Sequence, residues 1–233
     1  MTLDLDDRRE QVLDALARAM GGSETARAKL LGVKGATLAA ATAADRGARE
    51  GPTTAAIERY TGVLYDALDV RTLKAVERRR LDASVLIFSG LWGAAAPGDP
   101  IPDYRLKMGA ALPKLGKLST WWRDDLSAAI AERAAGRNVW NLLPNEHAAA
   151  WRPPDGTSQW SVRFLEAAET GALVAVSHRN KSLKGALVRH LLRRPGSSPQ
   201  DLAGWEHPAG YRYEPALDDV QGGVTLLSLV RRA

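Results

Sequence analysis

The stretch ALVAVSHRNKSLKGALVRHLL, residues 172–192, decides the fold class, because its pattern changes from strand to helix within a few residues. Residues 172–177 are a short apolar run, which is typical of a buried strand. Leucines then recur at helical spacing and predict a basic helix over residues 180–194. The junction therefore joins a strand directly to a helix, as in folds that cover a sheet with helices.

The first turn of this helix is a candidate anion site. The first backbone N–H groups of a helix have no partner within the helix, and they lie at the positive end of its dipole. Several polar side chains would lie beside them. The side chains that would contribute are Asn180, Lys181 and Ser182, with Lys184 and Arg189 further along the helix. Phosphate is the natural ligand of such a site. The alternative is a surface helix with a good cap.

Other segments carry both kinds of pattern. Apolar or alternating runs predict strands over 84–88, 138–143, 159–165 and 224–230, and amphipathic runs predict helices over 6–20, 23–31, 53–69 and 119–135. Three prolines within residues 94–104 predict an irregular loop. We expect a mixed α/β (α+β) fold in a single compact domain, residues 1–233, with a central mixed sheet. A helical N-terminal lobe over about 6–80 would precede an α/β body over about 81–233.

Composition excludes several classes of protein. The chain has 233 residues, 45% hydrophobic and 25% charged, which excludes global disorder. It has no cysteine, so disulfide scaffolds, thiolate nucleophiles and cysteine-based zinc or iron–sulfur sites are excluded. The first ten residues are acidic and polar, unlike a signal peptide, and no apolar run reaches the roughly 18 residues of a membrane span. We expect a cytoplasmic, monomeric protein that does not bind membranes.

Few residues suggest catalysis. The histidines lack metal-ligand spacing, so we expect no metal and no cofactor. There is no nucleophile elbow, phosphate-binding P-loop or dinucleotide-binding fingerprint. Glu146 follows a predicted strand and could act as a general base, and His178 and Lys181 are the other candidate catalytic groups. Whether the protein is an enzyme stays open at this point.

Positive charge is gathered in three stretches. The formal net charge is +5. Residues 71–80 carry several cations and a single acid, and residues 104–123 and 177–194 carry cations and no acid. Two such stretches that met in space would form a strongly positive cleft. We therefore favour an anionic partner, the alternative being a set of solvated basic faces.

Two glycines near the N-terminus predict a hairpin between helices. In LLGVKGATLAAATAAD, residues 30–45, Gly32 and Gly35 separate two helical pieces, with Lys34 between the glycines. Gly-containing turns of this kind can direct backbone N–H groups at a phosphate, as in helix–hairpin–helix elements. The usual pattern spaces the glycines by one residue, whereas here two residues intervene. An ordinary helix–helix connection is the alternative.

A second basic motif is PDYRLKMG, residues 102–109. Arg105 and Lys107 alternate with apolar residues, so an extended segment would point both cations the same way. Arg105 can contact phosphate or carboxylate through two parallel hydrogen bonds, and Tyr104 beside it could stack or form a hydrogen bond. The alternative is a structural arginine that pairs with a buried acid.

Several longer stretches together resemble one protein family. They are YTGVLYDAL (60–68), FSGLWGAAAPGDPIPDYRLKMG (88–109), WWRDDL (121–126), NLLPNEH (141–147), SHRNKSLKGALVRHLL (177–192) and DLAGWEHPAGYRYEP (201–215). In this order, over about residues 8–230, they resemble the peroxide stress protein YaaA family. The chain departs from the family at its start, because it lacks the usual N-terminal strand and the Pro-containing, Lys-bearing turn after it.

The resemblance implies a function. Members of the family are linked to protection against peroxide and oxidative stress and to limiting intracellular iron, and are described as DNA-binding. By similarity, the Gly32–Gly35 segment would be the family's helix–hairpin–helix element beside a basic cleft. We expect DNA, bound with little sequence preference, to contact Arg105, Lys181, Lys184, Arg189 and the hairpin backbone. The alternative is an enzyme in the same cleft. Arg105, Asn180 and Lys181 would clamp an anionic or phosphorylated small molecule, and His178 or Glu146 would transfer protons.

Overall fold

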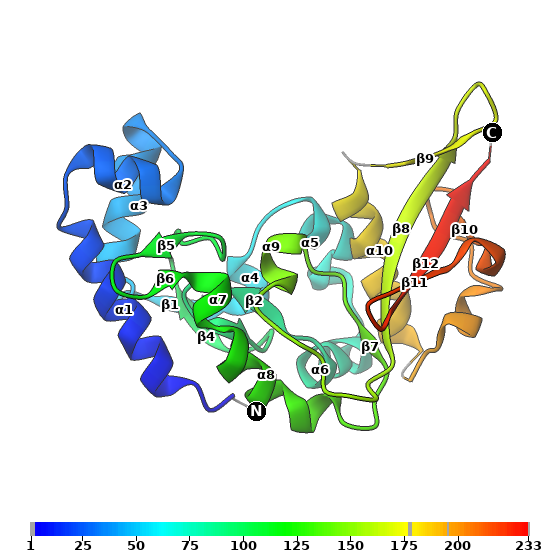
Figure 1. The fold of residues 1–233 in the computed structure, drawn as a ribbon, viewed down its shortest axis with the longest axis horizontal. Coiled ribbons are helices and arrows are strands. Elements are labelled where there is room, and N and C mark those ends of the chain that lie inside the picture. The colour runs from blue at the N-terminus through cyan, green and yellow to red at the C-terminus, as the bar shows by residue number, and fades with distance from the viewer. Residues whose placement is uncertain (1–2, 177–178, 195, 233) are drawn as a thin grey trace. The chain divides into compact units, whose positions relative to one another are not determined.

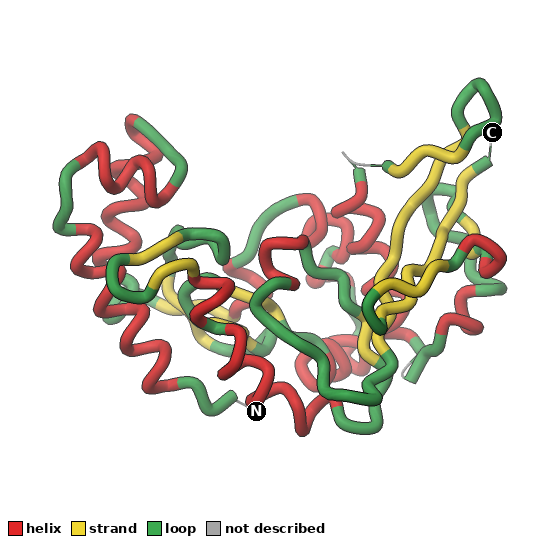
Figure 2. The backbone as a smooth tube through the Cα atoms, viewed as in Figure 1, coloured by secondary structure: helices red, strands yellow, loops and turns green. Residues whose placement is uncertain are grey.

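The structure is a computed structural model that describes residues 3–176, 179–194 and 196–232 (Figures 1 and 2). The chain forms two compact units that interleave along the sequence. Unit 1 takes the chain up to residue 59 with 82–133 and 143–153, and unit 2 takes 60–81, 134–142 and the chain from 154 onward. Helices and strands occur in both units, which confirms the mixed α/β fold class. The division near residue 80 stays a prediction.

Unit 1 begins with three helices, α1 (Asp6–Met20), α2 (Glu24–Leu31) and α3 (Gly35–Arg46). The apolar stripe of α1 is buried, and it includes Val12, Leu13, Leu16 and Met20. Four shorter or later helices complete the unit: α4 (Ala56–Arg59), α7 (Leu118–Trp121), α8 (Arg123–Ala134) and α9 (Asn145–Ala148). The helix expected over 119–135 is therefore two consecutive helices, α7 and α8.

The strands of unit 1 form three two-stranded antiparallel ribbons. They pair β1 (Thr53–Ala55) with β4 (Pro100–Pro102), β2 (Ile87–Ser89) with β3 (Gly93–Ala95), and β5 (Ala111–Leu112) with β6 (Gly116–Lys117). Two expectations from the sequence were wrong here. The helix expected over 53–69 starts as strand β1, and the strand expected over 84–88 begins only at Ile87 and ends at Ser89, as β2.

The proline-rich segment 94–104 is also more regular than expected. The bond from the Ala56 amide to the Asp99 carbonyl identifies the hydrogen-bonded positions of the β1–β4 ladder. Thr54 opposite Ile101 is the next such position, and the two prolines of β4 fall at the positions between. Their missing N–H groups are therefore not needed by the ladder, which is how an edge strand tolerates proline.

Unit 2 contains the main sheet. Its long central strands β8 (Gln159–Ala167) and β12 (Val224–Arg231) pair in parallel, and β7 (Val139–Trp140) is parallel to β8. Three antiparallel strands extend the sheet: β9 (Leu173–Ala175) beside β8, and β10 (Arg212–Tyr213) and β11 (Asp219–Gln221) beside β12. Parallel and antiparallel pairs in one sheet confirm the expected mixed sheet.

The helical segments of unit 2 are α5 (Val63–Leu68), α10 (Asn180–Arg193), the start of α6 (Ala75–Ser84), and three short 3₁₀ helices, η1 (Val70–Thr72), η2 (Pro199–Leu202) and η3 (Pro215–Leu217). α10 buries Leu183 and Leu187 against Phe164 of β8 and Leu229 of β12. Figure 1 shows α10 running beside the two central strands. The helix expected over 180–194 is confirmed.

No helix in the described part of the chain is long and apolar enough to cross a membrane.

Candidate functional site

The predicted site residues are divided between the two units. Unit 1 contains Gly32, Lys34, Gly35, Tyr104, Arg105, Lys107 and Glu146, and unit 2 contains Asn180, Lys181, Ser182, Lys184 and Arg189. His178 lies outside the described residues. Each group is therefore described within its own unit, and the basic cleft stays a prediction.

The predicted hairpin consists of α2, a three-residue turn and α3. Gly32 ends α2 at a φ of +67°, a left-handed conformation that favours glycine. Lys34 precedes α3 in an extended conformation, and its side chain does not cap the helix. Both residues are exposed, as is Gly35. The backbone at the start of α3 is thus accessible and lies beside a lysine, although a DNA-binding helix–hairpin–helix element stays a prediction.

Lys107 approaches this turn from a distant part of the sequence. A methyl group placed on Gly32 would lie 3.8 Å from the Lys107 Nζ atom. Lys107 and Arg105 are exposed, whereas Leu106 and Met108 are buried, as the alternating pattern predicted. The loop over residues 103–109, hereafter the basic loop, therefore brings a cation to the α2–α3 turn within unit 1.

Hydrogen bonds that involve side chains of unit 1 help to hold the basic loop in place. The Tyr104 hydroxyl lies 2.6 Å from Ser89 Oγ, the Arg105 amide donates to Asp45 Oδ1 at 2.7 Å, and the Gly109 amide donates to Glu146 at 2.9 Å. Arg105 thus does contact a buried acid, but through its backbone. The Arg105 guanidinium takes no part in that hydrogen bond.

Ser89 organises the start of the quoted 88–109 segment. Its Oγ accepts hydrogen bonds from the amides of Leu91 and Trp92, at 3.1 and 3.0 Å. Both lone pairs are then occupied, so the Ser89 hydroxyl proton is directed at the Tyr104 oxygen. A side chain on Gly90 would come within 2.5 Å of the Leu106 carbonyl, so only glycine fits against the basic loop.

Glu146, the candidate general base, lies at the start of α9. Its carboxylate accepts a hydrogen bond from the Gly109 amide, and a Cβ atom on Gly109 would lie 2.4 Å from that carboxylate. Glu146 therefore fastens one end of the basic loop. Its role in proton transfer stays a prediction.

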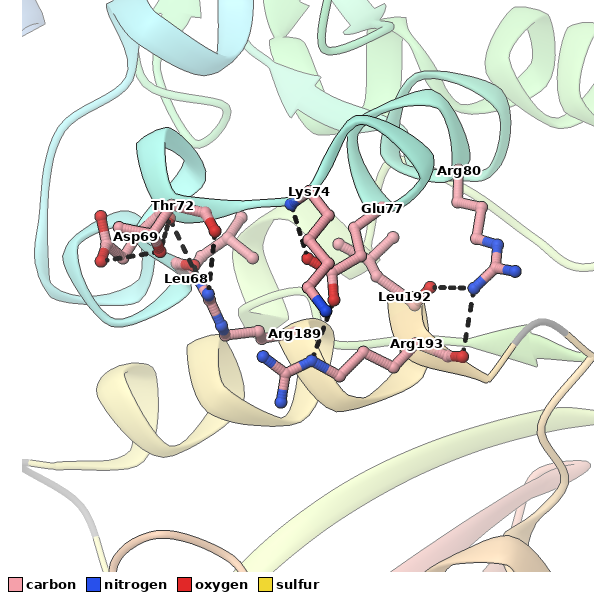
Figure 3. A network of polar contacts seen from close by, with 9 residues as sticks. All are labelled: Leu68, Asp69, Thr72, Lys74, Glu77, Arg80, Arg189, Leu192 and Arg193. Carbon is pink, nitrogen blue, oxygen red and sulfur yellow. Dashed lines mark hydrogen bonds and ion pairs between the residues drawn. The ribbon is translucent and has the colours of Figure 1, made fainter.

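The arginines of α10 are largely engaged inside unit 2 (Figure 3). Arg189 donates from Nη1 to the carbonyls of Leu68 and Asp69, at 2.9 and 3.1 Å, and from Nη2 to the carbonyl of Thr72 at 3.3 Å. These carbonyls belong to the end of α5 and to η1, so Arg189 caps one helix from another.

A second set of contacts joins α10 to α6. Arg193 forms an ion pair of 3.0 Å with Glu77, and the Lys74 amide donates to the same carboxylate at 2.8 Å. The Lys74 amide, together with Arg193, holds the pKa of Glu77 below its usual value. Arg80 of α6 donates to the carbonyls of Leu192 and Arg193 at 3.0 and 3.1 Å. The helices are thus fixed by reciprocal charged contacts (Figure 3).

The remaining predicted site residues of α10 differ in their exposure to solvent. Lys184 is half-buried, its ammonium donates to the Leu142 carbonyl at 3.2 Å, and burial lowers its pKa. Lys181 is exposed. The Ser182 hydroxyl donates to the Arg179 carbonyl at 2.9 Å. Asn180 Oδ1 is buried and has no hydrogen-bond partner within residues 3–176, 179–194 and 196–232.

A comparison with known families decides the identity. The family model described as peroxide stress protein YaaA matches residues 2–217. The chain belongs to the peroxide stress protein YaaA family.

Three relatives illustrate how YaaA-family sequences match the chain. A UPF0246 protein of Streptomyces coelicolor is 39% identical over 201 residues, which cover 84% of this chain and 74% of the relative. A UPF0246 protein of Leptothrix cholodnii is 32% identical over 167 residues, 70% of this chain and 65% of the relative. One of Corynebacterium glutamicum is 39% identical over 153 residues, 63% of this chain and 58% of the relative. The chain thus spans less than two thirds of the length of the last two.

Asp45 is the residue at this site that sequence reasoning missed. It is 3% exposed, near the end of α3, and Oδ2 has no partner among the described residues. Burial raises its pKa to about 7, with a smaller contribution from Asp103, and the hydrogen bond from the Arg105 amide opposes the shift. Its contact lies sixty residues away. An aspartate at the end of an alanine-rich helix gives no sign of this in the sequence.

In the described part of this YaaA-family chain, no group of three His, Asp or Glu side chains is placed to hold a metal ion.

Proposed function

We propose that this YaaA-family protein binds DNA through its phosphates, with little sequence preference, as part of protection against peroxide and of limiting intracellular iron. The observation that carries the proposal is the position of the Lys107 ammonium beside Gly32 of the α2–α3 turn. Two parts of unit 1 that are far apart in sequence, each singled out as basic or phosphate-binding, meet at this point.

The chemistry of this place suits a phosphate. The start of α3 has no side-chain cap, so its first amides remain available to an anion, and the helix dipole favours negative charge there. Lys34, Arg105 and Lys107 are exposed in the same unit. Contacts of this kind recognise the nucleic-acid backbone and carry no sequence information, which supports weak sequence preference.

We propose a smaller contribution from unit 2. Lys181 is exposed in the first turn of α10, where it can meet a phosphate. Arg189 and Lys184 already donate to backbone carbonyls, so they act on DNA binding mainly by holding α10 in place. Of the predicted contact residues of this helix, Lys181 would thus bind phosphate directly, and Lys184 and Arg189 would support the helix.

Affinity measurements on several forms of DNA test the proposal. Fluorescence anisotropy would follow duplex, single-stranded and branched DNA at about 50 and 200 mM salt. Contacts to about four phosphates would weaken duplex binding about 100-fold over this range. Lys34→Ala/Lys107→Ala should bind at least about tenfold more weakly at low salt. Arg18→Ala/Arg152→Ala, which loses the same charge from two other exposed positions of unit 1, is the matched control.

Weak wild-type binding that does not change with salt would contradict the proposal.

A second candidate function follows from α10. Lys181 is exposed in the first turn of this helix, and the preceding residue, Arg179, supplies no side-chain cap. We propose, as the alternative, that this turn binds the phosphate of a small-molecule substrate. A thermal shift with phosphorylated metabolites that disappears in Lys181→Ala, together with no binding of DNA, would favour this function.

A further inference from the structure

We propose that Asp45 is the positioning residue of the basic loop, and that its ionisation weakens the binding of phosphate by Arg105 and Lys107. This inference rests on the proposed phosphate-binding function and deepens it, because it identifies a group that regulates the site.

The contact between Asp45 and the loop is direct. Asp45 Oδ1 accepts the Arg105 amide proton at 2.7 Å, in the middle of the segment that carries both loop cations. The carboxyl group is almost entirely buried, and its second oxygen has no partner among the described residues. A charge on Asp45 is therefore poorly screened by water, and the basic loop is the segment that contacts it through a hydrogen bond.

Charged neighbours of Asp45 come from the basic loop and from the end of α3 with the turn after it. The loop contributes Asp103 and Arg105. The end of α3 and the turn after it contribute Arg46, Arg49 and Glu50, which line one cavity with Asp45. From α1, the residues at this cavity are Leu13 and Ala17, which are apolar. Arg49 is bound to Glu10 and Asp14, so it does not neutralise Asp45.

The direction of the coupling follows from the charge states. Burial is the main reason that Asp45 has a pKa of about 7, so the side chain is mostly neutral at pH 6 and mostly ionised at pH 8. An ionised Asp45 places a negative charge behind Arg105 and repels a phosphate on the loop. Because coupling is reciprocal, a bound phosphate must in turn favour the neutral form of Asp45. We expect affinity to fall about fivefold between pH 6 and pH 8 through this residue.

The first experiment needs no DNA. The backbone amide of Arg105 would be followed by ¹⁵N NMR from pH 5.5 to 8.5, in wild type and in Asp45→Asn. Its chemical shift should titrate near neutral pH in wild type and stay flat in Asp45→Asn, which preserves an oxygen acceptor for the amide. An Arg105 amide that does not titrate in wild type would overturn the proposal.

The second experiment measures binding at pH 6 and pH 8, with duplex DNA and with inorganic tripolyphosphate as probes. Wild type should lose about fivefold more affinity than Asp45→Asn between these pH values. Asp103→Asn is the matched control, because it removes an exposed carboxyl group from the same loop and leaves the buried hydrogen bond intact. It should still lose affinity between pH 6 and pH 8, with the midpoint at a slightly lower pH than in wild type, because the Asp103 charge helps to raise the pKa of Asp45. Equal losses in wild type and Asp45→Asn would overturn the proposal.

The two probes separate failure of this inference from failure of the proposed function. If tripolyphosphate binds with the expected pH dependence and DNA does not bind, DNA binding is wrong and the role of Asp45 stands. If neither probe binds at either pH, both proposals are overturned.

Discussion

Gly185 lies where α10 crosses α5, and the packing there leaves no room for a side chain. A Cβ atom at this position would lie 2.3 Å from the Leu64 carbonyl and 2.8 Å from Ala67. The neighbour is backbone, so it cannot rotate away as a flexible side chain would. This one residue therefore sets how closely the basic helix approaches α5.

We predict that Gly185→Ala lowers the free energy of unfolding by at least about 2 kcal/mol, because the two helices must separate. Chemical denaturation would measure the change. Gly204→Ala is the control, since nothing lies within 4 Å of a Cβ atom there, and it should change stability by less than about 0.5 kcal/mol. A mild effect at Gly185 would show that α10 can move away from α5 at little cost.

For single residues, the sequence predicted the directions of side chains better than it predicted their hydrogen-bond partners. Alternation alone placed Arg105 and Lys107 on one side of the segment and Leu106 on the other, because it depends only on the neighbouring residues. The bond between Asp45 and the Arg105 amide could not be predicted. It depends on which loop packs against the end of α3, and that is a property of the tertiary structure.

The arginines on the polar face of α10 help to attach this helix to α5, η1 and α6. Arg189 donates to three carbonyls at the end of α5 and in η1, where the last carbonyls of a helix lack a full set of intrahelical partners. The Asp69 carbonyl also accepts the Thr72 amide. The sequence marks the same arginine as a phosphate contact. A basic helix therefore resembles an anion site in sequence even where its cations bind carbonyl oxygens of the same unit.

We predict that Arg189→Ala lowers the free energy of unfolding by about 1–3 kcal/mol, the usual effect of losing hydrogen bonds from a charged donor. Thermal or chemical denaturation would detect it. Lys181→Ala, at an exposed position of the same helix, should leave stability within about 0.5 kcal/mol and weaken DNA binding instead. If Arg189→Ala were as stable as wild type and lost DNA binding directly, Arg189 would be a phosphate contact.

Long elements were predicted well and short ones poorly. The helix α10 and the strands β8 and β12 have clear periodic patterns, so their positions followed from the sequence. The ribbon of β1 and β4 did not, because its strands have three residues each and its prolines suggest a loop. Pairing with a distant segment, rather than a local preference, makes such strands.

The two units contain buried titratable groups with opposite responses to pH. Asp45 in unit 1 has its pKa raised to about 7 by burial. His190 in unit 2 is buried and stacks on Trp205 at 4.3 Å, and burial, with Arg194 and Arg193, lowers its pKa to about 4. The contribution of Asp45 to stability is lost as the pH rises from about 4 to about 7, and that of His190 is lost as the pH falls from about 6.5 to 4.

We therefore predict that a change from pH 7.5 to pH 5 stabilises unit 1 and destabilises unit 2, each by about 1–3 kcal/mol. Hydrogen exchange, corrected for the intrinsic effect of pH and read separately for peptides of each unit, would measure both. Asp45→Asn should remove the response of unit 1, and His190→Phe, which keeps a ring on Trp205, should remove that of unit 2. Parallel changes in both units would contradict this assignment.

The central claim concerns the whole molecule, namely that the basic loop of unit 1 binds phosphates of DNA. The most direct test is the slope of log affinity against log salt concentration for wild type and Arg105→Ala/Lys107→Ala on one duplex. Loss of two phosphate contacts should make the slope shallower by about 1.8, whereas Arg18→Ala/Arg152→Ala should keep the wild-type slope. An unchanged slope in the loop variant would contradict the account, because any DNA contacts would then lie elsewhere.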